Sequence, residues 1–499
     1  MKVALFEEGK KKYKTFQDLV KDLNLHVIMN YMVAERKEDI AWISEVLSVP
    51  LETKEAIGKR NEIVKFFCEN PVLAKEGYEL IRNHYEHYKR LLEVIETSKN
   101  SHEKSAILIA SSIDIMKCLG EFFQKLTSWM EDNSMEKIPQ MKLLWESFYE
   151  EVTREQIQEI VTFTKNMDAF KRDGAMTLEL GIGREFQVSN IRFVGSKSIS
   201  YKRRYDLPWQ KKRGVRAYKE EKNCAEGMEF GNAVIVQFVR ENINVFRLWE
   251  EQLRRLRRQS AFLMGCVTLY HRGKERDFYY CYPELSGNQC QTEELYELSL
   301  AFQTTTFPVV NSVSLTEKQI LVITGANQGG KSTFLRSLGI AQVMYQAGMF
   351  IPAKMYSSKI YHQIFSHFTR REDAAMNTGR FEEELKRMEY ILQNVQGSSL
   401  ILSNETFCGT TEVTAAKVAM AIALGIEGHS IELWMVTHIS KFAIELWEKG
   451  DEKHLFLSAA HDRTGERRFK MEQKPPENTS FGMELFEQII EEKSSPEPL

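Results

Sequence analysis

The chain has 499 residues, of which 43% are hydrophobic and 27% are charged, and its formal net charge is −3. This length allows two to four domains, and the charge excludes a global basic field, so nucleic-acid binding would need a local patch. Apolar stretches stay below membrane-spanning length, "MKVALFEEGKKKYK" lacks a signal-peptide core, and the seven cysteines form no C-x-x-C pair. We therefore expect a cytoplasmic protein with reduced thiols and no membrane contact.

Amphipathic helices are predicted over the first third of the chain. Between Thr15 and Met167, apolar residues recur at helical spacing, as in "KEDIAWISEVL" and "SAILIASSIDIMKCLGEFFQKLTSWM". The pattern changes between about 174 and 200, where "AMTLELGIGREFQVSNIRFVG" has short alternating runs and several glycines. This second pattern predicts β-strands.

A basic segment follows, from Lys197 to Lys222, with ten Lys/Arg against three Asp/Glu and interleaved aromatic residues. Positive charge with aromatics is typical of a contact with a phosphate backbone. A solvated loop whose aromatics dock on neighbouring helices is the alternative. The candidate DNA contacts are Lys202, Arg203, Arg204, Lys211, Lys212 and Arg213.

A long helix is predicted from about Met228 to Gly265, with an arginine-rich face that is typical of a solvated surface. After Val267 the runs "CVTLYH" and "DFYYCYP" look like strands, and a compact α/β domain is expected from about 262 to 485. The polar tail "EEKSSPEPL" is expected to be frayed.

The stretch "VITGANQGGKSTFLRS" fits G-x-x-x-x-G-K-[ST], with an apolar strand before it and a helical pattern after it. Such a loop turns backbone N–H groups around phosphate oxygens at a helix N-terminus. Lys331 would reach the β- and γ-phosphates of ATP, and the Ser332 hydroxyl would bind Mg²⁺. The predicted nucleotide-binding residues are Gly325, Ala326, Asn327, Gln328, Gly329, Gly330, Lys331, Ser332 and Thr333.

Two later strands end in polar residues that suit the same site. The apolar run from Leu400 to Leu402 precedes Asn404 and Glu405. The amide oxygen of Asn404 can accept a hydrogen bond from a water on Mg²⁺, and Glu405 stands where a general base would polarise the attacking water. A second strand ends at Thr437 and His438, where a histidine could sense or stabilise a γ-phosphate. A strand-end carboxylate and a structural histidine are the plainer alternatives.

These motifs, in this order and spacing, resemble the MutS family of mismatch-repair ATPases, which are ABC-type ATPases. The glycine loop is similar to the family's ITGPN-x-GGKST-x-x-R, and "FPVVNSVSL" resembles a segment that places an aromatic ring and Asn311 near adenine. "FTRREDAAMNTGRFEEELKRM" resembles a loop that approaches the partner subunit's nucleotide, with Phe381, Glu384 and Leu385 matching. "TSFGMELF" resembles the start of the family's last helix, and "VPLETKEAIGKRNEIVKFFCENP" resembles its helical core.

The resemblance implies ATP and Mg²⁺ as cofactors, a homodimer and action on DNA. Some positions depart from the family pattern: Asn404 replaces an Asp, Gly379 a trans-acting Ser, and Cys408 an Arg. The family's mismatch-reading domain is expected to be absent, so classical mismatch recognition is not expected. A degenerate, nucleotide-switched scaffold and an ABC-type ATPase with a non-DNA protein partner remain alternatives.

The predicted architecture is an α-helical core and lever region followed by an α/β P-loop ATPase domain of the ABC type. The expected ranges are a helical core at 1–170, a small β and basic segment at the lever tip (a reduced clamp) at 171–228, a returning lever helix at 229–262, the ATPase domain at 263–485 and a flexible tail at 486–499.

Overall fold

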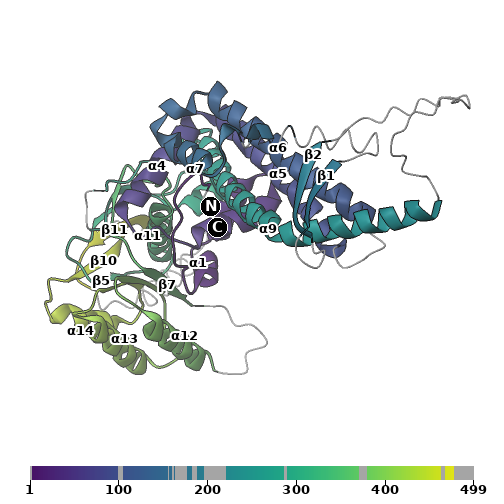
Figure 1. The fold of residues 1–499 in the computed structure, drawn as a ribbon. Coiled ribbons are helices and arrows are strands. Elements are labelled where there is room, and N and C mark those ends of the chain that lie inside the picture. The colour runs from purple at the N-terminus through teal and green to yellow at the C-terminus, as the bar shows by residue number, and fades with distance from the viewer. Residues whose placement is uncertain are drawn as a thin grey trace, which may run out of the picture. The chain divides into compact units, whose positions relative to one another are not determined.

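The computed structural model describes residues 3–98, 105–155, 157–159, 162, 177–182, 188–195, 221–285, 289–369, 379–461 and 467–476. The chain divides into two compact units (Figure 1). The first unit contains Met1–Leu5 and Lys75–Ser260, and the second contains Phe6–Ala74 and Ala261–Leu499. Residues 6–74 therefore belong to the same unit as the glycine loop. The domain ranges drawn from the sequence stay predictions.

The first unit is built from helices and one hairpin. Its elements are α5 (Pro71–Ser98, from Lys75 onward), α6 (Ser105–Asp132), η3 (Met135–Lys137), η4 (Pro139–Met141), α7 (Lys142–Glu151), β1 (Thr177–Ile182), β2 (Val188–Gly195) and α9 (Glu221–Lys274, as far as Ser260). Aromatic rings fill its core, where Phe123 meets Trp249 edge to face at 4.9 Å. The predicted helices and the predicted strands after residue 174 are both confirmed, and β1 pairs with β2 antiparallel.

Helix α9 corrects the sequence-based boundaries at both of its ends. The helix runs from Glu221 to Lys274, so "CVTLYH" is helical and not a strand, and "DFYYCYP" contributes only an isolated bridge at Cys281. Gly265, where we expected the helix to end, lies inside it. A Cβ at Gly265 would stand 2.8 Å from Ile43 Cδ1, so the glycine serves close packing against α3 (Ile40–Leu47). The apolar run stays helical, and its Cys266, Val267 and Leu269 are buried, so tertiary packing overrides its strand-like pattern.

The second unit contains two sheets and their covering helices. The helices are α1 (Phe16–Asp22), α2 (Leu25–Val33), η1 (Lys37–Asp39), α3, α4 (Lys54–Glu69), α10 (Leu298–Gln303), α11 (Lys331–Gln346), α12 (Arg380–Asn394), α13 (Glu412–Ile426) and α14 (Ser440–Glu448). An antiparallel three-stranded sheet has the order β4 (Asn311–Ser314), β3 (Gln291–Leu295), β6 (Met355–Ser357).

The central sheet has six strands. Their order is β11 (Arg467–Gln473), β10 (His454–His461), β5 (Ile320–Thr324), β9 (Ile431–Val436), β8 (Ser399–Asn404) and β7 (Gln363–Phe368). All neighbours are parallel except β11, which pairs antiparallel with β10. The strands β5, β8 and β9 are buried almost throughout, as parallel strands covered on both faces must be, and the predicted strands at these positions are confirmed.

Alternate residues of each strand pack on opposite faces of this sheet. Ile401 and Met435 join the core formed with α12, α13 and α14, which lie along one face in Figure 1. On the other face, α11 approaches so closely that a Cβ at Gly339 would stand 2.7 Å from Leu402 Cδ1. The predicted helix after the glycine loop is thus confirmed, and the sheet lies between two helical layers.

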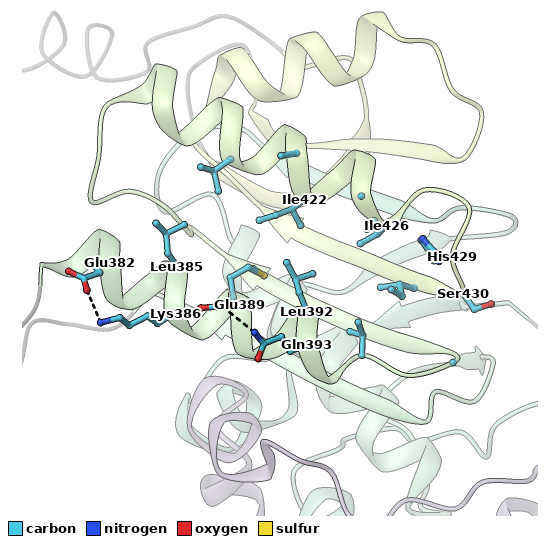
Figure 2. Close-up of a pocket in the computed structure, with 17 residues that line it drawn as sticks. Glu382, Leu385, Lys386, Glu389, Leu392, Gln393, Ile422, Ile426, His429 and Ser430 are labelled. Carbon is cyan, nitrogen blue, oxygen red and sulfur yellow. Dashed lines mark hydrogen bonds and ion pairs between the residues drawn. The ribbon is translucent and has the colours of Figure 1, made fainter.

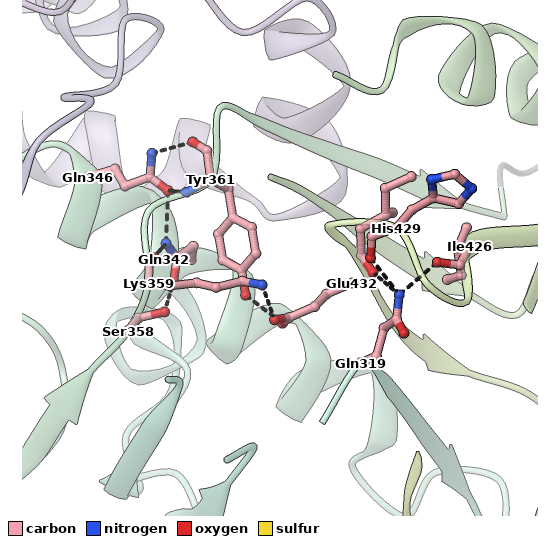
Figure 3. Close-up of polar contacts among 10 residues, drawn as sticks. Gln319, Gln342, Gln346, Ser358, Lys359, Tyr361, Ile426, His429 and Glu432 are labelled. Carbon is pink, nitrogen blue, oxygen red and sulfur yellow. Dashed lines mark hydrogen bonds and ion pairs between the residues drawn. The ribbon is translucent and has the colours of Figure 1, made fainter. Parts of the chain in front are cut away.

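A buried polar network links α11 to the sheet (Figure 3). We call it the Tyr361 network; it consists of Gln342, Gln346, Ser358, Lys359, Tyr361 and Glu432. Tyr361 donates its O–H to Glu432 Oε2 at 2.6 Å, and Lys359 forms an ion pair with the same carboxylate. Gln346 Nε2 donates to the Tyr361 carbonyl at 2.8 Å, and Gln342 Nε2 donates to Gln346 Oε1 at 2.8 Å.

Candidate functional site

The carboxyl ends of four parallel strands meet at one edge of the central sheet. The glycine loop follows β5, Thr369 follows β7, Glu405 follows β8, and Thr437 with His438 follows β9. Open parallel sheets bind ligands at this edge, because the loops that leave the strands converge there. We call this region, with Lys331, Glu405 and His438 as its ionisable groups, the P-loop edge.

The glycine loop has the backbone that its sequence predicts. Gly325 and Gly330 have φ values of 108° and 87°, which favour glycine, and Gly330 is the N-cap of α11. A Cβ at Gly329 would stand 2.7 Å from the Cβ of Ala459, so the loop also requires a glycine to pass β10. Helix α11 therefore begins directly at the loop, with its first N–H groups available to an anion.

Lys331 lies buried at the base of this loop. Its Nζ donates to the carbonyl oxygens of Gly325 at 2.8 Å and Ala326 at 2.7 Å. Burial lowers the pKa of its ammonium to about 8, and the negative charge of Glu405 opposes that shift. Anionic oxygens in the loop would favour the charged ammonium more strongly than these two carbonyls do.

Glu405 and His438 meet from neighbouring strands. His438 Nε2 lies 2.9 Å from Glu405 Oε1, and this hydrogen bond, ahead of any other cause, lowers the pKa of the Glu405 carboxyl. The carboxylate is therefore ionised at neutral pH. Glu405 also has a φ of 55°, a strained value for a side chain of its size, and strain of this kind clusters at functional sites. Thr369 Oγ1 donates to the Glu405 carbonyl, which fixes the turn.

The donor set at this edge fits a magnesium ion. The Oδ1 atom of Asn404 is buried, and no other group in the described part of the chain donates a hydrogen bond to it. Ser332 lines the same cavity as Glu405 and Lys331. Hydroxyl and amide oxygens with a nearby carboxylate suit a hard cation that keeps several waters. Asn404 supplies an acceptor without charge, so the expected water-mediated role is chemically possible.

A cavity of about 380 Å³ lies over the glycine loop. The loop residues from Gln328 to Thr333 form one wall, and Phe307, Asn311 and Phe469 contribute to the others. Asn311 is held by β11, because its Nδ2 donates to Phe469 O at 3.2 Å and its Oδ1 accepts from Met471 N at 2.8 Å. An apolar wall opposite an anion-binding loop is suited to a base linked to phosphates.

Sequence reasoning missed three residues of this region. Glu297 lines the cavity, is buried, and has its pKa raised by that burial. Phe469 comes from the edge strand β11, and Thr369 holds the Glu405 turn. Of the three, only Glu297 could have been noticed in the sequence, as an acidic residue at a helix N-cap. Its side chain accepts a hydrogen bond from the backbone N–H of Leu300, three residues later. Nothing in the sequence around Phe469 indicated proximity to the loop, and Thr369 stood only at the start of a segment expected to approach a partner's nucleotide.

Several residues predicted to take part in the site lie away from the P-loop edge or outside the described residues. The six candidate DNA contacts between Lys202 and Arg213, the segment "TSFGMELF" and positions 370–378 of the predicted trans-acting loop all lie outside the described residues. Gly379 is the N-cap of α12, which carries Phe381, Glu384 and Leu385. Phe381 meets Phe407 at 6.4 Å, and Glu384 is buried.

A larger groove of about 1130 Å³ lies between α12 and α13, away from the P-loop edge (Figure 2). Leu385, Leu392 and Ile422 form its apolar walls, and the ion pair of Glu382 with Lys386 lies at its rim. No set of buried ionisable groups converges there among the described residues. Its size alone does not make it a chemical site, and the P-loop edge remains the candidate.

Comparison with known protein families agrees with this geometry. A family model described as MutS domain V matches residues 321–492, which include the glycine loop, Glu405 and His438. Over this stretch, the chain matches the MutS family. Its helices and mixed sheet are consistent with domain V of that family.

Relatives with MutS in their names support this match. The chain is 37% identical to MutS protein homolog 4 of Mus musculus over 116 residues, which is 23% of this chain and 12% of the relative. It is 29% identical to a DNA mismatch repair protein MutS of Leuconostoc mesenteroides over 180 residues, 36% of this chain and 21% of the relative. It is 34% identical to an endonuclease MutS2 of Lactiplantibacillus plantarum over 132 residues, 26% and 17% of the two chains.

The matched stretches thus span well under two thirds of these relatives. The resemblance seen in the sequence is confirmed at the level of the family, while the role of each residue at the P-loop edge stays a prediction. Among the described residues, the helices are too short or too polar to cross a membrane.

Proposed function

We propose that this chain binds ATP with Mg²⁺ at the P-loop edge and hydrolyses it. The observation that carries the proposal is the convergence of Lys331, Glu405 and the glycine loop on one cavity. The loop N–H groups and the Lys331 ammonium would hold the phosphates. Magnesium, when bound, neutralises phosphate charge, and Ser332 with a water held by Asn404 would keep it in place.

Glu405 would orient and polarise the attacking water. Its carboxylate is ionised and held by His438 at 2.9 Å, so it can accept a hydrogen bond from a water in a fixed direction. His438 would position Glu405 and lie near the terminal phosphate. Phe307 and Asn311 would form the wall against the adenine ring, as the family resemblance implies.

The further proposal is an ABC-type ATPase that dimerises through this domain and acts on DNA. The match to the MutS family supports it, and the basic segment from Lys197 to Lys222 supplies the charge that a duplex contact needs. Segment 371–385 would approach the nucleotide of a second copy. Reduced thiols would suit the cytoplasm as the location. Classical mismatch recognition forms no part of the proposal.

One observation favours a second candidate, a scaffold that is switched by nucleotide and hydrolyses it slowly or not at all. Asn404 carries no charge where an aspartate would strengthen the hold on magnesium, and Gly379 has no side chain to reach a partner's phosphate. In that case ATP would bind and change the assembly state without efficient turnover. A protein partner in place of DNA is compatible with the net charge of −3.

The test is the rate of ATP hydrolysis by the wild type and by Glu405→Gln, with and without duplex, single-stranded and branched DNA. We expect Glu405→Gln to bind ATP normally and to lose about 10²- to 10⁴-fold in turnover, because a positioned base contributes roughly that factor. Equal turnover in both proteins would remove Glu405 from the mechanism. ATP binding without turnover in the wild type would favour the scaffold.

DNA binding has its own test. Phosphate contacts release counterions, so affinity should fall log-linearly with salt and depend little on base sequence. A variant with serine at 202, 203, 204, 211, 212 and 213 should bind duplex more weakly, with a flatter salt slope and unchanged basal hydrolysis. A gel-shift series across salt concentrations measures both. The same affinity and slope as the wild type would exclude this segment as the contact.

A further inference from the structure

Three potential metal ligands meet at the edge of the central sheet opposite the P-loop edge. Glu427 is the C-cap of α13, Asp451 follows α14, and His454 is the first residue of β10. His454 pairs with Ile320 at the start of β5, so the cluster lies where the parallel strands begin, whereas the glycine loop lies where β5 ends. The nucleotide site uses none of these residues.

The ligand atoms are already close together. One carboxylate oxygen from each acid and one ring nitrogen of His454 lie within 4.8 Å of one another. His454 Nε2 and Glu427 Oε1 are 3.4 Å apart. Two ligands at about 2.0–2.1 Å from a tetrahedral zinc ion are themselves roughly 3.3 Å apart, so this pair is already spaced for one metal.

The imidazole of His454 is the second and independent observation. Its side chain is 1% exposed, and neither ring nitrogen forms a hydrogen bond with any group in the described ranges. A buried imidazole without hydrogen bonds is costly, and native structures seldom leave one in that state. The Glu427 carboxylate lies 3.4 Å from Nε2 but outside hydrogen-bond geometry. A cation bound by Nε2 would satisfy this nitrogen.

We propose that Glu427, Asp451 and His454 bind a divalent transition-metal ion, with Zn²⁺ as the fitting ion. Zinc accepts imidazole nitrogen and carboxylate oxygen as ligands, and water can take the fourth position, whereas an imidazole is a poor match to the all-oxygen preference of Mg²⁺. The backbone N–H of Lys453 donates to Asp451 Oδ1 at 2.8 Å, which orients that carboxylate while its other oxygen stays available.

The surroundings allow an ion to enter and give it a structural role. Asp451 is exposed and the Glu427 side chain is 33% exposed, while His454 is enclosed, so the ion would enter from the carboxylate side. Bound there, it would tie the end of α13 and the turn after α14 to the first residue of β10. Because binding needs the folded arrangement, it would raise the unfolding temperature.

The test uses the full chain, freed of any histidine tag and stripped of metal by a chelator. Titration with Zn²⁺ alone is followed by calorimetry, and Co²⁺ serves as a spectroscopic probe because tetrahedral Co²⁺ absorbs visible light. The variants are Glu427→Gln and Asp451→Asn, which keep side-chain shape at the exposed rim. Glu452→Gln is the matched control, since Glu452 is exposed and adjacent but outside the cluster.

We expect the wild type and Glu452→Gln to bind one equivalent of Zn²⁺ more than the double variant Glu427→Gln/Asp451→Asn. The visible Co²⁺ bands and the zinc-dependent rise in unfolding temperature should be lost with that equivalent. Equal zinc uptake and equal Co²⁺ spectra in all three proteins would overturn the proposal. So would a Co²⁺ spectrum of thiolate ligation, which would assign the ion to cysteine. Unfolding temperatures measured without metal show whether the variants are folded.

Discussion

The Tyr361 network and the P-loop edge both place polar side chains beside the same sheet, yet they differ in how those side chains are partnered. In the Tyr361 network, Gln342 Oε1 accepts from Ser358, and Glu432 accepts from Tyr361 (Figure 3). Gln342 Oε1 also accepts from Tyr356, which lies next to the network. At the P-loop edge, Asn404 Oδ1 has no donor among the described residues, and Lys331 has only carbonyl oxygens of its own loop.

This difference indicates that the Tyr361 network stabilises the fold, whereas the P-loop edge is suited to a ligand. A network whose members satisfy one another stabilises the fold and has nothing left to offer a ligand. The P-loop edge leaves acceptor and donor capacity open, in a strained backbone, where a phosphate and a cation could complete it. The two regions should therefore respond oppositely to substitution: one in stability, the other in nucleotide chemistry.

Among the substitutions that compare the two regions, the largest effect on turnover is expected from His438→Asn at the P-loop edge. Without the 2.9 Å hydrogen bond, Glu405 loses its orientation and the cause that most lowers its pKa. ATP turnover should fall about 10- to 100-fold, the usual cost of losing a residue that orients a functional group. The pKa of Glu405 should rise, so the acid limb of the pH–rate profile should move to higher pH.

The matched control for that variant is His429→Asn. His429 is exposed and lies beyond the opposite end of β9, where its carbonyl, and not its ring, accepts from Gln319. Steady-state hydrolysis across pH should be unchanged in this control. An unshifted profile in His438→Asn would show that Glu405 does not depend on His438.

The second effect is a pH dependence of ATP affinity. Burial lowers the pKa of free Lys331 to about 8, and bound phosphates would raise it, so the complex holds a proton that the free protein has lost above that pH. Affinity should be full below about pH 8 and should fall as pH rises, by up to about tenfold per pH unit. Calorimetry in buffers of different ionisation enthalpy should detect proton uptake above pH 8. Affinity that stays constant to about pH 9.5 would contradict this role of Lys331.

The smallest effect on nucleotide chemistry is expected from Tyr361→Phe in the Tyr361 network. The variant removes the donor to the Glu432 carboxylate at 2.6 Å, which should lower the free energy of unfolding by about 1–3 kcal/mol. ATP affinity should stay unchanged. Tyr390→Phe is the control because Tyr390 is 47% exposed on α12. Urea unfolding of both variants measures the difference in the free energy of unfolding. A loss of ATP affinity in Tyr361→Phe would contradict the claim that the two regions have separate roles.

The sequence predicted the parts of this unit that depend on local pattern. The strand before Gly325, the helix after Lys331 and the strands before Glu405 and His438 follow from apolar runs and glycine spacing, and the structure has them. The parallel order of β5, β9 and β8 then brings Glu405 and His438 together, which two separate motifs could only suggest.

The rest depends on contacts between residues distant in sequence. The run "CVTLYH" has a strand-like pattern, but it is helical and largely buried, and that burial depends on residues distant in the sequence. Phe469 reaches the cavity through the edge strand β11, and residues 6–74 join the same unit as the loop. Neither the position of Phe469 nor the placement of residues 6–74 can be read from the periodicity of the sequence.

The most direct measurement is titration of ATP with Mg²⁺ into the wild type and Lys331→Ala, followed by calorimetry. The Lys331 ammonium donates hydrogen bonds to two carbonyl oxygens of the loop, and its removal takes the cation from the β- and γ-phosphates. We expect at least about a tenfold loss of affinity, which is about 1.4 kcal/mol. Equal affinity in the two proteins would contradict the claim that the P-loop edge holds the nucleotide.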